Sequence, residues 1–427
     1  MSTLHPATDP AVYTPHAARF SQEGQPTTAQ GWISRAQDVA AILAADATQR
    51  DAANASPVAE VSLLKSSGLL RVLGRASWGG GAQPWSVAYR AIREVAKGDG
   101  SIGMLLGYSL LWSQTASVVG TPAQAAYWGE KITRENLFIG GAVNPRDADL
   151  EVTEEEGGVV FSGSKHFNTG GVVSDLTVLE GVIAGTEKHV FAFVETRQEG
   201  IVFAHNWNNI GLRLTESGGV RINAVRAPWT DALGYDPHTK APIPGILEVP
   251  YATLLLPTIQ LVFANFYLGI TQGALDAARA YTTRSTRPWP FGGDVKTAAT
   301  DEFYILERYG AFFASVRAVE TLADRAGAEL STLYAEHSEA RDVSAERRGE
   351  VAEWVASAKV AATDVGLRVT SDVFEVTGAK ATSRSAGLDR FWRDVRTHSL
   401  HDPVAYKRRE LGRYFLLGEL PVPTWYT

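Results

Sequence analysis

The feature that most constrains this chain is a helical spacing of apolar residues that persists through three long segments of its C-terminal part. These segments cover residues 262–285, 303–330 and 348–378, and each exceeds twenty residues. Apolar side chains recur every three or four residues, which gives each helix one apolar stripe. Helices of this length bury their stripes against one another, so we predict a helical bundle over residues 246–427.

A different pattern, typical of β-strands, fills the middle of the chain. Between about Leu137 and Trp229, short β-branched runs such as GGVVFSGSKHF and KHVFAFVE are bounded by glycine. Before them, from residue 30 to about 134, the alanine-rich sequence again has a helical period. We therefore predict a mainly α protein with a central β domain: a helical domain (1–135), a β domain (136–245) and the C-terminal bundle.

The composition excludes several kinds of chemistry. The 427 residues include no cysteine, which rules out disulfides, thiolate metal sites, iron–sulfur clusters and a cysteine nucleophile. The formal net charge of -7 leaves no basic excess for binding nucleic acid. The nine histidines are scattered without the paired spacing of metal ligands, so we expect no metal site.

The two most membrane-like features of the sequence are weak. Residues 1–20 lack a basic segment followed by an apolar core, so we expect a partly ordered arm, no export signal and a cytoplasmic protein. The apolar stretch from Tyr251 to Gly269 is interrupted by Pro257, Gln260 and Asn265. It predicts a buried core helix better than a membrane span.

Local motifs connect this order of elements to a known fold. Residues 163–182 (GSKHFNTGGVVSDLTVLEGV) resemble the middle-domain segment that lies beside the flavin in acyl-CoA dehydrogenases, and residues 374–403 resemble their flavin motif and final active-site helix. The resemblance implies the acyl-CoA dehydrogenase fold, with an N-terminal helical domain, a middle β-barrel-like domain and a C-terminal four-helix bundle. Fold alone does not determine function.

A narrower resemblance is to the dibenzothiophene monooxygenase group, which includes bacterial indole hydroxylases. It is carried by IQLVFANFYLGITQGALDAAR, RPWPFGG, RFWRDVRTHSLHDPVAYK and DGSIGMLLGY, at residues 259–279, 287–293, 390–407 and 99–108. The likeness spans almost the whole chain beyond the N-terminal arm.

This resemblance implies a two-component oxygenase. Such enzymes take reduced flavin, FADH2 or FMNH2, from a separate NAD(P)H:flavin reductase and insert one atom of O2 into an aromatic heterocycle through a C4a-hydroperoxyflavin. The sequence has no dinucleotide-binding GxGxxG unit, which is consistent with a separate reductase. The resemblance further implies a small aromatic substrate and a homotetramer, and it leaves the choice between FMN and FAD open.

The sequence after residue 392 argues against a dehydrogenase. Many acyl-CoA dehydrogenases have R-D-A-x-x-x-x-I-Y-E-G-T here, and the glutamate removes the α-proton of a thioester. In this chain the glutamate position is Asp402 and the tyrosine position is His401. Aspartate is one methylene shorter, and a base must come within about 3 Å of its proton. Thioester desaturation is therefore disfavoured.

Two histidines are the candidate catalytic groups in this segment. His401 is expected to orient the flavin peroxide or flavin N5 and to move a proton, a task that suits an imidazole. His398 is three residues earlier, so both rings are expected to face one cleft. The alternative is that one or both are hydrogen-bonded structural histidines.

The resemblance also assigns flavin-binding residues. Thr169 matches a hydroxyl near the flavin and Trp207 an aromatic residue packed along its ring, whereas their plain alternatives are a strand-end threonine and a buried interface tryptophan. Arg287 and Lys380 match basic positions that reach the flavin phosphate, often across a subunit contact. Exposed surface charges are the alternative for both.

Three further positions concern the substrate. Tyr108 matches a tyrosine that lines the substrate and flavin cavity of the group, and the resemblance makes it a catalytic candidate that donates to the peroxide or the substrate. Met104, four residues earlier, replaces a histidine of the dibenzothiophene enzymes. Gly141 stands where those enzymes have an asparagine near the flavin. A thioether removes a donor and enlarges the apolar wall, so indole-type ring hydroxylation is favoured over thiophene sulfoxidation.

Two other interpretations stay open. The chain can be an FAD-dependent acyl-CoA dehydrogenase that uses Asp402 as its base, or a catalytically silent scaffold that kept the fold. Against the scaffold, His401, Asp402, Arg287 and Tyr108 are all present together, whereas a scaffold needs only its apolar positions.

Overall fold

The computed structural model describes residues 6–143, 149–292 and 296–424. Its N-terminal part is helical, as the spacing predicts. The α-helices there are α1 (Thr14–Glu23), α2 (Ala29–Ala44), α3 (Ala47–Ala53), α4 (Val58–Ser67), α5 (Trp85–Gly98), α6 (Gly100–Ser113), α7 (Thr115–Val119) and α8 (Pro122–Glu135).

The expected N-terminal arm is more ordered than predicted. Within the described residues a 3-10 turn at Pro10–Tyr13 leads directly into α1. Tyr13 and Phe20 are buried at 6% and 2% exposure, so the segment is packed onto the helical domain. Residues 1–5 lie outside the described residues.

Among the described residues, the middle of the chain forms one seven-stranded sheet and a two-stranded ribbon. In the sheet, β4 is the shared neighbour: β1 and β2 run parallel to it along one edge, and β5 runs antiparallel along the other. The remaining strands continue from β2 in the order β3, β7, β6. The strands are β1 (Ile139–Ala142), β2 (Leu150–Glu155), β3 (Gly158–Lys165), β4 (Leu176–Ile183), β5 (His189–Glu195), β6 (Ile201–Phe203), β7 (Val220–Pro228), β8 (Tyr235–Asp236) and β9 (Ala241–Pro242).

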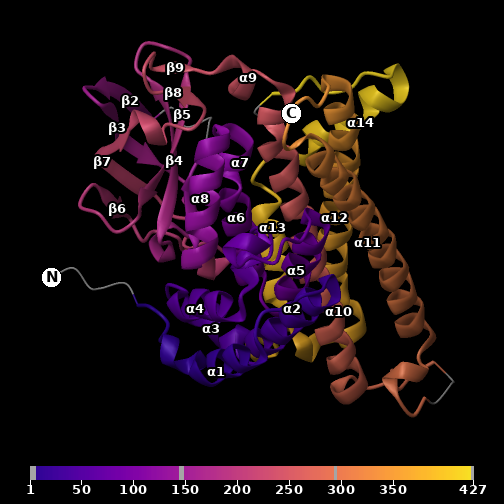
Figure 1. The fold of residues 1–427 in the computed structure, drawn as a ribbon. Coiled ribbons are helices and arrows are strands. Elements are labelled where there is room, and N and C mark those ends of the chain that lie inside the picture. The colour runs from indigo at the N-terminus through magenta and orange to yellow at the C-terminus, as the bar shows by residue number, and fades with distance from the viewer. Residues whose placement is uncertain (1–5, 144–148, 293–295, 425–427) are drawn as a thin grey trace.

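The C-terminal part is the predicted bundle, with helices longer than the sequence pattern indicated. Figure 1 shows α11 and α12 as long neighbouring rods beside α10, with α13 and α14 completing this half of the molecule. The helices are α9 (Pro244–Leu247), α10 (Leu255–Ser285), α11 (Phe303–His337), α12 (Ala345–Thr377), α13 (Asp389–His398) and α14 (Val404–Leu417). The motif at residues 287–293 ends on Gly293, which lies outside the described residues.

In the part of the chain that the structure describes, two helical segments are long and apolar enough to cross a membrane by composition, and both lie in the core. They are Gly100–Val119 and Pro250–Ser285, whose most apolar windows are 83% and 89% buried. The apolar stretch from Tyr251 therefore lies where the sequence predicts, inside the protein.

Helix α6 is the central element of the fold. It lies between the sheet and the bundle (Figure 1), and every residue from Gly100 to Trp112 is buried. Glycines permit this close packing: a Cβ atom at Gly107 would lie 2.4 Å from Cγ1 of Val262 on α10. The side chains of α6 are thus fixed against both halves of the molecule.

Candidate active site

A cavity of about 780 Å3 opens between α6, the loop after β6, α10 and the turn after α13. Its volume is in the range of small-molecule and cofactor sites. It brings together eight of the residues singled out in the sequence, namely Met104, Tyr108, Gly141, Thr169, Trp207, His398, His401 and Asp402. A second hollow of about 520 Å3, beside β5 and β7, contains none of them.

His398 is held between two tyrosines. Its Nε2 atom lies 3.0 Å from the hydroxyl of Tyr108, and its Nδ1 atom lies 2.6 Å from the hydroxyl of Tyr267. Burial, reinforced by the neighbouring His401, lowers the pKa of His398 well below its ordinary value. Burial also raises the pKa of both tyrosines, so the trio is neutral at physiological pH.

Sequence analysis missed Tyr267. It lies on α10, 131 residues before His398 in the chain. Because α10 is an apolar helix, the sequence pattern does not distinguish Tyr267 from the other aromatic residues of the core. Only the packing of α10 against α13 pairs its hydroxyl with the imidazole.

His401 lies outside the helix that the resemblance predicted. Helix α13 ends at His398, and the backbone N–H of His401 donates to the His398 carbonyl oxygen at 2.9 Å in the turn that follows. The two imidazoles nevertheless stack, with ring centroids 5.1 Å apart. Both rings line the cavity, but the side chain of His401 is 48% exposed and also meets solvent, whereas His398 is buried.

Asp402 is engaged by two basic side chains. Nζ of Lys359, from α12, donates to Oδ2, and Nδ1 of His401 lies 3.3 Å from Oδ1. Burial alone would raise the pKa of this carboxyl, but the bond to His401 and the charge of Lys359 outweigh it and lower the pKa below its ordinary value. A carboxylate so stabilised is a poor proton acceptor, which weakens the dehydrogenase interpretation.

Two hydroxyl groups that line the cavity, those of Thr169 and Ser217, form a row with the buried hydroxyl of Thr215. Oγ1 of Thr169 lies 2.9 Å from Oγ of Ser217, which lies 2.8 Å from Oγ1 of Thr215. Near this row, the indole N–H of Trp207 donates to the Leu212 carbonyl oxygen at 2.8 Å, which holds the indole plane in place. A polar row beside a fixed aromatic face suits a flat, partly polar ligand.

Gly141 does not leave an empty space. A Cβ atom there would lie 2.5 Å from Nε1 of Trp112, so the indole of Trp112 occupies the room that a side chain would need. That indole N–H is buried and has no hydrogen-bond partner among the described residues. Met104, 3% exposed on the same helix, lines the same cavity. The space that a side chain at residue 141 would fill is therefore occupied by the aromatic ring of Trp112.

Arg287 and Lys380 are exposed, and neither lines the cavity. Within one chain the structure therefore does not bring them to the other site residues. Their expected contact with a flavin phosphate, across a subunit boundary, stays a prediction.

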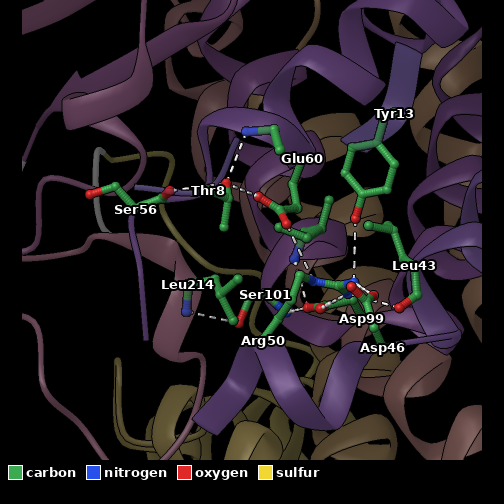
Figure 2. Close-up of polar contacts among 12 residues, drawn as sticks. Thr8, Tyr13, Leu43, Asp46, Arg50, Ser56, Glu60, Asp99, Ser101 and Leu214 are labelled. Atoms are coloured by element: carbon green, nitrogen blue, oxygen red, sulfur yellow. Dashed lines mark hydrogen bonds and ion pairs between the residues drawn. The ribbon is translucent and has the colours of Figure 1, made fainter. Parts of the chain in front are cut away.

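A buried polar cluster anchors the start of α6 (Figure 2). The Asp99 side chain accepts hydrogen bonds from the N–H groups of Ser101 and Ile102, which caps the helix. Arg50 holds this carboxylate at 2.7 Å and also approaches Glu60 at 3.4 Å. The cap fixes the helix on which Met104, Tyr108 and Trp112 are carried.

A second buried carboxylate joins the loop to α13. Oδ1 of Asp394 accepts from the backbone N–H of Leu212 at 2.6 Å. Burial raises the pKa of Asp394 to about 7. The loop that carries Trp207 is thereby tied to the helix that carries His398.

The residues present fit a flavin. The unpartnered N–H of Trp112, the hydroxyl row and the plane of Trp207 offer donors and an aromatic face of the kind that an isoalloxazine ring uses. Trp207 and Thr169 would hold the ring, and His401 and Tyr108 would face its reactive side.

Comparison with known proteins gives matches along most of the chain. Residues 261–405 match the family model described as "Acyl-CoA dehydrogenase, C-terminal domain". Dibenzothiophene monooxygenase of Rhodococcus qingshengii is 35% identical over 92% of this chain and 94% of its own. A probable FMNH2-dependent monooxygenase of Pseudomonas putida is 36% identical over 92% of this chain and 97% of its own.

Two solved structures share the fold with the same TM-score. Methanesulfinate monooxygenase of Pseudomonas fluorescens has a TM-score of 0.86 and 36% identity, over 92% of this chain and 99% of its own. TdsC of Paenibacillus sp. A11-2, in a complex with FMN and indole, has a TM-score of 0.86 and 32% identity, over 93% of this chain and 99% of its own.

Proposed function

The chain belongs to the family of flavin-dependent monooxygenases that includes dibenzothiophene monooxygenase, and we propose that it inserts one atom of O2 into a planar heteroaromatic substrate. The family matches confirm the acyl-CoA dehydrogenase fold expected from the sequence. The observation that carries the proposal is the cavity in which a neutral Tyr108–His398 pair and His401 face aromatic walls. When bound, reduced flavin supplies the electrons that activate O2, and the second oxygen atom leaves as water.

The protein's own residues would control protons and water at this site. Tyr108 and His398 are buried and neutral, so they offer a hydrogen bond without releasing free charge into the cavity. His401 is partly exposed and lies next to Asp402, which suits it to exchange a proton with solvent. Phe263 packs against both imidazoles, with ring centroids 4.4 Å from His398 and 5.0 Å from His401, and gives them an apolar neighbour.

An indole-type ring is the substrate we favour, followed by a thiophene. TdsC has been solved with FMN and indole bound, and the walls here are aromatic: Tyr108, Trp112, Trp207, Phe167 and Phe263 line the cavity. An electron-rich ring stacks well against such surfaces.

An anionic sulfinate, the substrate in the name of the P. fluorescens relative, fits less well. Among the described residues that line the cavity there is no lysine or arginine, and Asp402 places a negative charge at its edge. Lys359 lies behind Asp402 and is paired with it. A small anion would find no free cation in this chain's cavity.

We further propose two partners. Reduced flavin would come from a separate NAD(P)H:flavin reductase, as the FMNH2-dependent name of the P. putida relative supports. A homotetramer would allow Arg287 and Lys380 of one chain to reach flavin bound in another, because both side chains are exposed and neither lines the cavity of its own chain.

The direct test is an aerobic assay with NADH, a generic flavin reductase and either FMN or FAD, with indole, dibenzothiophene and methanesulfinate offered separately. We expect an oxygenated product from indole, less from dibenzothiophene and none from methanesulfinate. Oxidation of methanesulfinate alone would overturn the substrate class.

A further inference from the structure

The neutral imidazole of His398 must donate in one of its two hydrogen bonds and accept in the other. A neutral histidine has one N–H donor and one acceptor nitrogen. Either Tyr267 donates to Nδ1 and Nε2–H donates to Tyr108, or Nδ1–H donates to Tyr267 and Tyr108 donates to Nε2. The two arrangements differ in where the proton of Tyr108 points.

Burial distinguishes the two arrangements. Tyr267 is 1% exposed, and among the described residues its hydroxyl has only the His398 ring as partner. If it accepted from Nδ1, its own proton would be stranded in the core, at a cost of about 1–3 kcal/mol. Tyr108 lines the cavity, so its proton can be donated to a molecule bound there.

The bond lengths favour the same arrangement. The Tyr267 contact of 2.6 Å is shorter than the range of about 2.7–3.2 Å for an N–H donor and indicates a hydroxyl donor, and the Tyr108 contact of 3.0 Å is compatible with an imidazole N–H donor. Both criteria therefore place the proton of His398 on Nε2.

We propose that Tyr267 is a positioning residue that fixes His398 as the Nε2–H tautomer, and thereby makes Tyr108 a hydrogen-bond donor into the cavity. In this chain of bonds each group donates to the next, from Tyr267 to His398 to Tyr108. A hydroxyl whose oxygen already accepts a bond is a stronger donor. The identity of the acceptor in the cavity, an atom of the flavin, its bound oxygen or the substrate, rests on the proposed function.

The chain of bonds begins inside the protein, at Tyr267. Phe263 and Phe266 cover His398 with ring centroids 4.4 and 4.8 Å away, and Tyr267 has no described route to solvent. The trio therefore orients a hydrogen bond and does not conduct protons from bulk water. His401, at the exposed end of the stack, is left to do that.

The tautomer can be measured without flavin or substrate. We would record 15N NMR spectra of the histidine-labelled full chain and assign His398 by the signal lost in His398→Asn. The expected result is a protonated Nε2 and an unprotonated Nδ1. A protonated Nδ1 in the native protein would overturn the proposal.

The variant Tyr267→Phe tests the cause. It keeps the ring but removes the donor to Nδ1, so the Nδ1–H tautomer should become populated. The matched control is Tyr89→Phe, which removes a buried tyrosine hydroxyl bonded at 3.1 Å to the Thr258 carbonyl oxygen and does not touch His398. If Tyr267→Phe leaves the tautomer as in the native protein, Tyr267 does not fix it.

The consequence for the reaction is measured separately. Product formed per NADH should fall about tenfold in Tyr267→Phe, the scale of one misdirected hydrogen bond, while flavin affinity stays within the range of the Tyr89→Phe control. Unchanged coupling in a variant with an altered tautomer would overturn the role of Tyr108 as donor. If the native chain oxygenates nothing, the proposed function fails while the tautomer result still stands.

Discussion

Lys359 and Asp402 form an ion pair at the edge of the cavity, at the position where the related dehydrogenases have their catalytic base. The lysine is 2% exposed and approaches the ring of Phe263 at 5.5 Å, so the pair is part of the aromatic wall. Asp402 is thereby kept as a stable anion that orients His401, and not as a free base.

The first prediction concerns this pair. Lys359→Met leaves Asp402 without its main partner and should lower the free energy of unfolding at pH 7 by about 3 kcal/mol. The pKa of Asp402 is lowered by folding, so its stabilising contribution is complete at neutral pH and is lost as the pH falls below about 4. Chemical unfolding at pH 7 and pH 3.5 checks both statements.

The control for that experiment is Lys407→Met, which removes a buried lysine paired with Glu410 at 2.7 Å. It should destabilise the protein without changing the pH-dependent contribution of Asp402 to the free energy of unfolding. Equal stability of Lys359→Met and the native chain at pH 7 would show that the pair contributes nothing.

A second prediction concerns Asp394, whose pKa is raised to about 7 by burial. A carboxyl group with a raised pKa holds its proton more tightly when folded, so its ionisation removes stability as the pH rises from about 4 through 7. Asp394→Asn keeps the acceptor for the Leu212 N–H but does not titrate. The native protein should lose about 2–3 kcal/mol more stability than the variant between pH 5 and pH 8. If both proteins lose the same amount of stability between these pH values, the group that titrates is not Asp394.

A third prediction concerns His401. His401→Ala should keep the fold and flavin binding but uncouple the reaction, so that NADH consumption yields hydrogen peroxide in place of product. The reason is that the partly exposed imidazole, oriented by Asp402, is the group placed to move a proton between the cavity and solvent. Peroxide and product are quantified together, with the exposed His238→Ala as control. Undiminished coupling would remove His401 from the mechanism.

A fourth prediction concerns the contact between Gly141 and Trp112. Gly141→Asn forces a side chain into the space that Nε1 of Trp112 occupies and should destabilise the protein by about 1–3 kcal/mol. Trp112→Phe, which shortens the ring system, should recover part of this loss when combined with Gly141→Asn. Thermal unfolding of the four proteins gives the coupling energy, and strict additivity would show that the two residues do not compete for space.

A fifth prediction concerns substrate choice. Met104 lines the cavity one helical turn before Tyr108, so Met104→His should change the ratio of rates on indole and dibenzothiophene more than it changes flavin affinity. Competition assays with both substrates present measure the ratio directly. An unchanged ratio would mean that Met104 only fills space.

The local sequence predicts much of this fold. Apolar residues spaced at three and four predict α10, α11 and α12. Helix α12 begins at Ala345, before the predicted start at residue 348, because the side chain of Ser344 caps it by accepting from the Arg347 N–H. The sequence prediction underestimated how ordered the N-terminal segment is. Pro15 in the first turn of α1 and the apolar pair Tyr13 and Phe20 are signals of a short packed helix, and composition alone does not reveal them.

The candidate site was predictable only in part. Residues in the motifs, such as Tyr108, His398 and Asp402, could be named because the resemblance marks them. Tyr267 and Lys359 could not, since each lies on a long core helix and gains its role only from packing against a distant segment. Sequence periodicity shows which face of a helix is buried, and not which polar atom that face will meet.

The most direct test of the central claim is a reaction under 18O2 with NADH, a flavin reductase, flavin and indole, followed by mass analysis of the product. We predict one atom of 18O in the product. An unlabelled product, or no product together with anaerobic reduction of bound flavin by an acyl-CoA, would contradict the claim and restore Asp402 as a dehydrogenase base.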